Sequence, residues 1–313
     1  MSASPLFLPT RRGTVSSSGE GALIRSIRRW LGRSSPPSPR GIGDDCAVVR
    51  PARGRELITV DPLVGGVHFD HRTPAREAGA KLLKRNLSDI AAMGGTPRVA
   101  VVALALDGRT SLAWLAAFHK GLAREAWRHA VLIVGGDVTR LDGSFVATLT
   151  LLGEARGRIL TRSGSRAGDW IYVTGALGRS LPTGHHHGFE PRLAEGAWLA
   201  RRAEVRAMMD VSDGLARDLA TLTPRGLAPA VYAALVPRRD GASLAEALGD
   251  GEDYELVFSV ASRSRRPKLE HAWKRAFPRT RLTCLGRFVK AGAVPPDAVT
   301  LAEHRGYEHH ATA

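Results

Sequence analysis

Acidic residues recur in this sequence in short groups that lie beside glycines or directly follow apolar runs. The groups are Gly43-Asp44-Asp45, Val60-Asp61, Asn86 to Asp89, Gly135-Gly136-Asp137, Asp210 to Gly214, and Gly251-Glu252-Asp253. Neighbouring carboxylates repel one another unless a cation or hydrogen-bond donors compensate their charge. A single Asp-Gly pair commonly marks a turn, but repeated groups of this kind indicate binding sites for a positive partner.

Divalent cations supply that compensation. Mg²⁺ prefers oxygen ligands and typically bridges carboxylates to the phosphates of a substrate, and glycines beside the acids allow backbone amides to approach those phosphates closely. The residues therefore predict a Mg²⁺-dependent enzyme that transfers a phosphoryl group or uses a nucleotide. The sequence has no Walker motif, no Gly-x-Gly-x-x-Gly after a strand and no kinase His-Arg-Asp, which disfavours the common nucleotide folds.

The composition excludes several other classes of protein. With 313 residues, 43% of them hydrophobic, the chain can form one large or two ordinary domains with real cores. Its two cysteines, Cys46 and Cys284, can form at most one disulfide. The sequence contains neither a signal peptide nor an apolar run long enough to span a membrane. We therefore predict a cytoplasmic protein with no membrane partner.

The net charge of +15 suggests a polyanionic partner, because 45 Lys and Arg face 30 Asp and Glu. Most of these basic residues are arginines scattered along the chain, and they are not interleaved with the aromatic residues of a single-strand binding platform. We predict no nucleic-acid partner. A basic nucleic-acid-binding protein is the alternative from another class of function.

Hydrophobic periodicity predicts the elements that must position the acids. Residues 1–19 read as a flexible tail, and apolar residues from Glu20 to Leu31 recur at helical spacing. Further along, we predict helices over 75–93, 112–129, 193–209, 214–222 and 264–276. Strands are predicted over 47–49, 57–60, 99–106, 131–134, 145–152, 170–174, 231–236, 254–260 and 282–288. This order indicates an α/β protein with two domains, 20–155 and 156–313, each pairing a sheet with helices.

Eight motifs, in order, resemble those of the thiamine-monophosphate kinase family. They are Gly41-Ile-Gly-Asp-Asp-Cys-Ala, Gly66-Val-His-Phe, Asn86-Leu-Ser-Asp-Ile-Ala-Ala-Met-Gly, Gly135-Gly-Asp-Val-Thr-Arg, Thr161-Arg-Ser-Gly, Gly168-Asp-Trp-Ile-Tyr-Val-Thr-Gly, Asp210-Val-Ser-Asp-Gly-Leu and Gly251-Glu-Asp-Tyr-Glu-Leu. Their spacing is comparable to that of the family, and the resemblance runs from about Glu20 to Tyr307.

The resemblance implies a two-domain fold shared with aminoimidazole ribonucleotide synthetase and selenophosphate synthetase. In that fold an N-terminal sheet domain, here 20–155, binds ATP and Mg²⁺ and forms a homodimer, and a C-terminal α/β domain, here 156–313, packs against it. It also implies that ATP phosphorylates thiamine monophosphate to thiamine diphosphate by direct transfer, without a phospho-enzyme.

The resemblance also implies roles for individual residues. Asp213 and Arg162 match catalytic positions, and Gly136, Asp137, Arg162 and Ser212 match nucleotide contacts. His68, Glu252 and Tyr307 match contacts to thiamine phosphate. The matching Mg²⁺ positions are Asp45, Thr59, Asp61, Asp89, Asp137, Asp210 and Asp213.

Some residues depart from the family pattern or have a simpler interpretation. The span between Gly175 and Asp210 is shorter than usual in the family, and Pro62 follows Asp61. Another ATP-using enzyme of the same superfamily, with a different phosphate acceptor, is therefore the alternative function. We interpret Asp253 as a residue that shapes its turn, and the three histidines 185–187 as a polar loop in preference to a transition-metal site.

Overall fold

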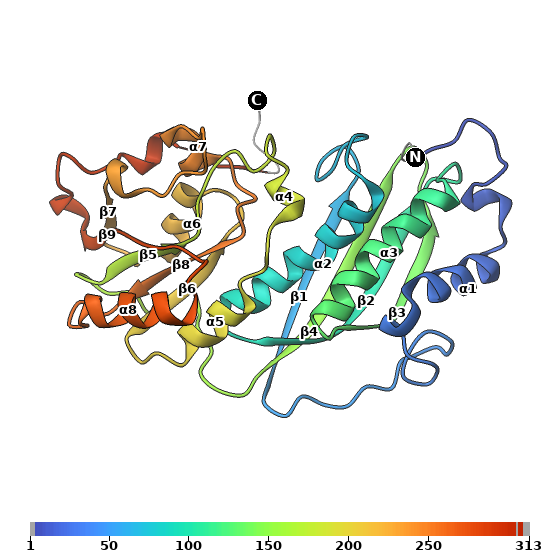
Figure 1. The fold of residues 1–313 in the computed structure, drawn as a ribbon, viewed down its shortest axis with the longest axis horizontal. Coiled ribbons are helices and arrows are strands. Elements are labelled where there is room, and N and C mark those ends of the chain that lie inside the picture. Colours follow the sequence, from blue (N-terminus) through green and yellow to red (C-terminus); the bar gives the residue numbers. More distant parts are fainter. Residues whose placement is uncertain (1–3, 305, 309–313) are drawn as a thin grey trace. The chain divides into compact units, whose positions relative to one another are not determined.

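The structure is a computed structural model that describes residues 4–304 and 306–308. The chain forms two compact units, one made of Met1–Ile90 with Thr96–Arg156 and the other of Ala91–Gly95 with Gly157–Ala313. Both units combine a sheet with helices (Figure 1), which confirms the predicted α/β class. In the part of the chain that the structure describes, no helix has the length and apolar character needed to cross a membrane.

The first unit is built on a four-stranded mixed sheet with the strand order β1-β4-β2-β3. Its elements are α1 (Glu20–Leu31), β1 (Arg55–Val64), α2 (Ala75–Ala92), β2 (Thr96–Leu106), α3 (Leu112–Arg128), β3 (Leu132–Arg140) and β4 (Phe145–Ala155), with short 3-10 turns at Val15–Ser17 and Gly32–Ser34. Strands β2 and β3 run parallel because α3 carries the chain back across the sheet. The Ser111 side chain caps the start of α3 by accepting from the Trp114 amide.

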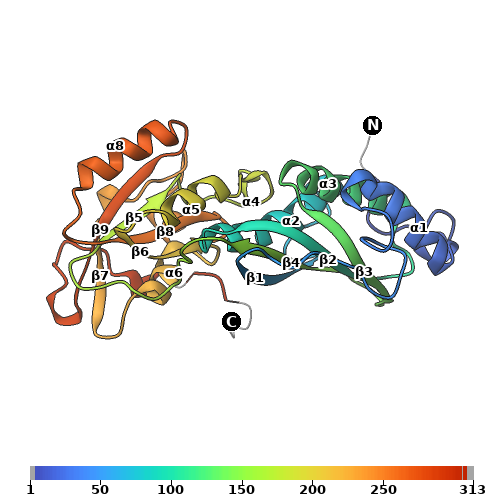
Figure 2. The same ribbon diagram turned by 90° about the horizontal axis from the view of Figure 1, so that it is seen from below.

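The three helices of this unit lie on one face of its sheet (Figure 2). The core between the helices and the sheet contains the packed rings of Phe69, Trp114, Phe118 and Phe145. The opposite face of the sheet bears exposed apolar side chains from three strands, namely Ile58, Val60, Val101 and Leu132. Alternation along each strand places these residues opposite the core, so the sheet has a second apolar face that its own helices leave uncovered.

Residues of the predicted N-terminal tail contact this unit. Phe7 and Thr14 form isolated bridges with Thr110 and Ser111, and Thr14 is fully buried. The flexibility of residues 1–19 stays a prediction.

The second unit is built on a five-stranded antiparallel sheet with the order β6-β8-β5-β9-β7. Its strands are β5 (Trp170–Thr174), β6 (Val205–Val211), β7 (Leu227–Val231), β8 (Glu255–Val260) and β9 (Leu282–Lys290). Its helices are α4 (His185–Gly188), α5 (Leu193–Ala200), α6 (Leu215–Leu222), α7 (Leu244–Gly249) and α8 (Arg266–Ala276), with 3-10 turns at Ala233–Leu235, Ala291–Ala293 and Leu301–Glu303.

This sheet has a hydrophobic core on each face. Val173 and Val257 pack with α6 and α7 on one face, whereas Tyr172 and Phe258 pack with α5 and α8 on the other. Figure 2 shows α8 and α6 on opposite sides of the strands. Burial on both faces explains why these strands are almost wholly apolar.

Two of the predicted elements are wrong. The helix predicted over 193–209 ends at Ala200, and β6 begins at Val205. Nearly every residue of β6 is buried, so it lacks the alternation that distinguishes a strand from a buried helix. The strand predicted over 47–49 is a loop in which Val48 and Val49 are exposed and the Val48 amide donates to the Pro39 carbonyl.

Two other strands differ in their limits. The strand predicted over 131–134 continues as β3 to Arg140, so that Gly135, Gly136 and Asp137 lie within the strand and not in a turn after it. The strand predicted over 231–236 is instead the end of β7 followed by a 3-10 turn. Glycines inside a strand weaken the pattern from which a strand is predicted, which accounts for the early end assigned to β3.

Candidate active site

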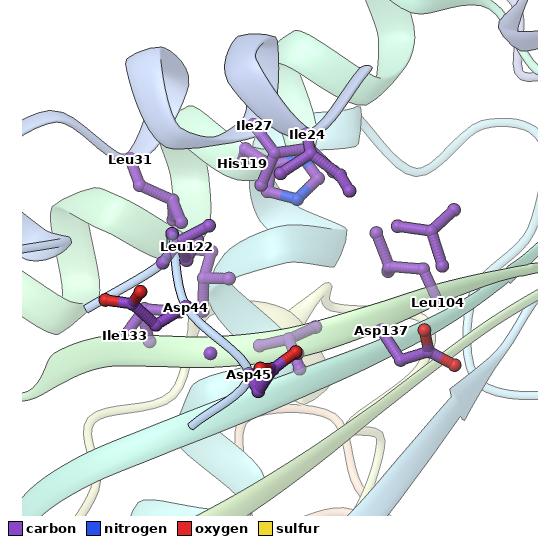
Figure 3. Close-up of a pocket in the computed structure, with 16 residues that line it drawn as sticks. Ile24, Ile27, Leu31, Asp44, Asp45, Leu104, His119, Leu122, Ile133 and Asp137 are labelled. Carbon is purple, nitrogen blue, oxygen red and sulfur yellow. The ribbon is translucent and has the colours of Figure 1, made fainter. Parts of the chain in front are cut away.

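A cavity of about 450 Å³ opens in the first unit between α1, α3 and the sheet. Its walls are apolar toward the helices, where Ile24, Ile27 and His119 lie, and acidic toward the strands, where Asp45 and Asp137 lie (Figure 3). Gly43 and Gly136 line the same cavity. The structure therefore brings together two acid groups that are far apart in the sequence, beside an apolar surface large enough for a flat ring.

Gly136 lies where β3 passes very close to β2. A Cβ atom at this position would lie 2.0 Å from the carbonyl oxygen of Val102, so no side chain fits there. Gly136 and Asp137 are both exposed, and both line the cavity. Uncovered backbone amides beside a carboxylate suit a phosphate with its metal ion.

A second group of predicted ligands forms a cluster on β1 and α2. The Thr59 hydroxyl donates to the Asp89 carboxylate, and the carboxyl groups of Asp61 and Asp89 are hydrogen-bonded to each other. Burial raises the pKa of Asp61, and the nearby Arg85 charge and the hydrogen bond with Asp89 act against this rise. Two carboxyl groups in this contact must share a proton or a cation.

Pro62, one of the departures from the family pattern, fits the position of β1 in the sheet. Strand β1 is an edge strand, where a proline can be accommodated without interrupting a central ladder. The Pro62 carbonyl accepts a 2.5 Å hydrogen bond from Arg85, which also lies 3.5 Å from an Asp61 oxygen. Pro62 therefore leaves the neighbouring acidic cluster in place.

His68 is held in a defined orientation just after β1. Its Nδ1 atom accepts from the Val64 amide at 3.0 Å, so the ring proton of the neutral histidine lies on Nε2. The backbone carbonyl of His68 accepts from the buried Lys81 ammonium at 2.7 Å. The ring thus presents a donor at Nε2, the chemistry that suits a phosphate oxygen.

In the second unit, the loop between β6 and α6 is held by a buried carboxylate. Asp218 Oδ2 accepts from the backbone amides of Ser212 at 3.0 Å and Asp213 at 3.1 Å. Burial, followed by the negative charge of Asp213, raises the pKa of Asp218 to about 7, and the charge of Arg162 opposes this rise. Ser212, Asp213 and Arg162, which the sequence analysis assigned to the site, therefore gather around Asp218.

The carbonyl groups of the same loop accept hydrogen bonds from two of the three residues predicted to contact the substrate. The Glu252 amide donates to the Ser212 carbonyl at 2.7 Å, and the Tyr307 amide donates to the Asp213 carbonyl at 2.8 Å. Asp210 is buried at the end of β6, opposite Leu256 in the ladder. Six of the predicted site residues therefore lie in or around this one loop.

The turn that carries Glu252 has a strained backbone. Glu252 and Tyr254 have φ values of 54° and 51°, which residues other than glycine rarely adopt. Between them, Asp253 is buried and accepts from the Gly178 amide at 3.0 Å, the Ser180 hydroxyl at 2.7 Å and the Arg239 guanidinium at 3.0 Å. These bonds hold the turn in place, which is the role expected of Asp253.

The predicted metal ligands are distributed over both units. Asp45, Thr59, Asp61, Asp89 and Asp137 belong to the first, and Asp210 and Asp213 to the second. Within residues 4–304 and 306–308, no three His, Cys, Asp or Glu side chains are grouped so as to hold a metal ion.

Sequence reasoning missed two residues that hold the site. Asp218 could have been found as an acid in the first turn of the helix that follows the Asp210 to Gly214 motif. Arg239 carried no signal, because its contact with Asp253 is made only in the folded chain.

Replacement of Arg239 by methionine is expected to destabilise the second unit by about 3–5 kcal/mol near neutral pH, because the Asp253 carboxylate would stay buried without its cation. Burial raises the pKa of Asp253 to about 6, and Arg239 opposes this rise, so removal of Arg239 raises the pKa further and lets the folded protein keep the proton to higher pH. The loss of stability should therefore be smaller at about pH 5 than at about pH 8. Urea denaturation at the two pH values measures it.

The matched control is the double variant Arg239→Met/Asp253→Asn, which removes both charges and should recover part of the stability. An equal loss at both pH values would contradict the assignment of the effect to a buried charge.

Comparison with known proteins places the chain in a family. Residues 43–155 match the family model described as "AIR synthase related protein, N-terminal domain". The thiamine-monophosphate kinase of Rhodopirellula baltica is 36% identical over 260 residues, which cover 77% of this chain and 80% of that protein.

Solved structures give the same result. Thiamine-monophosphate kinase from Stenotrophomonas maltophilia K279a matches with a TM-score of 0.71 and 33% identity, over 87% of this chain and 95% of that one. AaThiL complexed with AMPPCP and TMP matches with a TM-score of 0.65 and 27% identity, over 87% of this chain and 91% of that one. Together with the order of the acidic motifs, these likenesses show that the chain belongs to the thiamine-monophosphate kinase family.

Proposed function

We propose that this chain transfers the terminal phosphoryl group of ATP to thiamine monophosphate and so forms thiamine diphosphate. The observation that carries the proposal is the cavity of the first unit, where Gly136 and Asp137 meet Asp45 beside an apolar wall. The family relationship supports the same activity, and AaThiL has been solved with TMP and with AMPPCP, an analogue of ATP.

The cavity suits the two chemically different ends of a nucleotide. The apolar side chains of α1 and α3 can cover a purine ring (Figure 3). Gly43 and Gly136 line the same cavity and can offer backbone amides to phosphates. In the second unit, Arg162 and Ser212 gather around Asp218. Because the guanidinium of Arg162 is exposed, it is available to pair with a phosphate in a bidentate manner.

The chemistry of the acidic cluster on β1 and α2 fits Mg²⁺. Asp61 and Asp89 share a hydrogen bond that requires a proton between two acids, and a divalent cation held there would take the place of that proton and compensate both charges. Asp61, Asp89 and Thr59 would hold one such ion, and the family pattern implies that Asp45, Asp137, Asp210 and Asp213 are ligands of Mg²⁺ as well. When bound, Mg²⁺ neutralises the charge that develops on the transferred phosphoryl group.

The acceptor needs to be oriented and does not need to be activated. An oxygen of a phosphate monoester is already ionised at neutral pH, so transfer requires no general base. Nε2 of His68 can donate to that phosphate because Nδ1 is occupied by the Val64 amide. Glu252 and Tyr307, whose backbone amides donate to the carbonyls of Ser212 and Asp213, would contact the thiamine part of the acceptor.

The activity is tested with purified protein, ATP and thiamine monophosphate. We expect thiamine diphosphate and ADP to form together in the presence of Mg²⁺. Chelation of the metal should abolish product formation, and added Mg²⁺ should restore it. Chromatography of the thiamine esters measures the product. Conversion of a different phosphate acceptor while thiamine monophosphate stays unchanged would support the alternative enzyme of the superfamily.

The assay also tests Asp218, which positions the loop and does not itself touch the reacting atoms. The change Asp218→Ala leaves the amides of Ser212 and Asp213 without their acceptor and should lower kcat by about 10- to 100-fold. Asp218→Asn keeps one side-chain oxygen as an acceptor and should lower kcat by a smaller factor. The exposed Asp297→Ala is the control, and equal kcat values for all the variants would refute the positioning role.

The uncovered sheet face of the first unit supports the proposal that the protein is a homodimer. Neighbouring positions across the four strands form a continuous apolar row of Ile58, Leu152, Val99 and Leu132. Ile58 is 69% exposed and Val60, on the same face of the edge strand, is 56% exposed. A second copy would bury these side chains against its own identical face, as expected for a two-fold interface.

Introducing charge into this face should separate the dimer. Val60→Asp would bury a carboxylate at the interface, so we expect the mass measured by light scattering to fall from that of two chains to that of one. Leu235→Asp, at an exposed apolar residue of the second unit, is the control that should keep the larger mass. A wild-type mass of one chain would show that the dimer proposal is wrong.

A further inference from the structure

The segment from His185 to Phe189 contacts three consecutive residues of the strained turn. His186 Nδ1 lies 3.4 Å from Glu252 Oε2, and His185 Nε2 lies 2.9 Å from the Asp253 carbonyl oxygen. The Phe189 ring stacks on the Tyr254 ring with a centroid distance of 4.1 Å. We call this segment, which includes α4, the histidine segment.

The protonation of the first histidine agrees with this arrangement. Burial lowers the pKa of His185, which keeps its ring neutral, and Nε2 donates its proton to the Asp253 carbonyl. The adjacent ring of His186 is buried, and the Glu252 carboxylate that it contacts is also largely covered, with 21% of its side chain exposed. A contact between two covered polar groups fixes the direction of both side chains more firmly than a contact in open solvent.

The histidine segment contacts Glu252, a residue predicted to contact the phosphate acceptor. It lies in the part of the chain, between Gly175 and Asp210, that departs in length from the family pattern. Glu252 is bound through its backbone amide to Ser212, and through its side chain to His186. The side chain assigned to the thiamine part is therefore oriented by a residue outside the family motifs.

We infer that His186 is a positioning residue for the phosphate acceptor, and that it acts by orienting the Glu252 carboxylate toward the aminopyrimidine or thiazolium part of thiamine monophosphate. The inference rests on the proposed function. The His186 ring contacts Glu252 at Oε2, and a carboxylate can accept from an amino group or pair with a cation of the ligand through either oxygen. His186 does not contact ATP in this scheme, so its effect is confined to the acceptor.

Steady-state kinetics with each substrate varied in turn test the inference. His186→Ala should raise KM for thiamine monophosphate by about tenfold, the usual effect of losing one polar contact with a charged group. KM for ATP should change by less than about twofold, because the same change leaves the nucleotide contacts in place. His186→Asn places an amide donor where Nδ1 lies and should restore most of the affinity. His271→Ala, at an exposed histidine of α8, is the control.

Hydrogen exchange of the protein without substrates gives a second measurement that does not depend on the reaction. The amides of Glu252 and Tyr254, which donate to Ser212 and Val211, should exchange faster in His186→Ala and at the wild-type rate in His186→Asn. Equal changes in KM for both substrates, or unchanged KM and exchange in His186→Ala, would overturn the inference. Wild-type protein that leaves thiamine monophosphate unchanged would instead overturn the proposed function, and hydrogen exchange would still decide whether His186 holds the turn.

Discussion

A buried carboxylate at the start of α6 is the constraint on which the second unit's part of the site depends. Asp218 binds the amides of Ser212 and Asp213, and the carbonyls of these two residues in turn bind Glu252 and Tyr307. The backbone amides of this short loop are therefore bound by one side chain, and its carbonyl groups are bound by two segments that are distant in the sequence. A loop held in this way can present its own side chains outward without losing its shape.

The strained turn beside this loop follows the same principle. Its two left-handed residues, Glu252 and Tyr254, flank Asp253, whose carboxylate accepts from three donors. Strain of this kind costs about 1–3 kcal/mol at each position and persists only where the surroundings hold it. The buried Arg239 contact and the histidine segment provide that support.

In the first unit, the distribution of charge accounts for the apparent conflict between a basic chain and acidic motifs. The excess of basic residues, +15 overall, is spread along the sequence, whereas the acids converge in space at the cavity and on the faces of β1 and α2 that meet. Asp61 and Asp89 come within hydrogen-bonding distance because β1 packs beneath α2. The acidic residues, although fewer than the basic ones, are concentrated where they would bind the metal ions that neutralise a polyphosphate.

The sequence by itself determined the α/β class, most of the helices and strands, and the residue types of the site, because periodicity and the order of motifs are properties of neighbouring residues. It could not distinguish β6 from a helix, since burial on both faces removed the alternation. Only the tertiary structure decided that Asp45 and Asp137 share a cavity, that Asp218 and Arg239 hold the loop and the turn, and that His186 meets Glu252. These contacts join residues distant in sequence, and packing of the sheets brings them together.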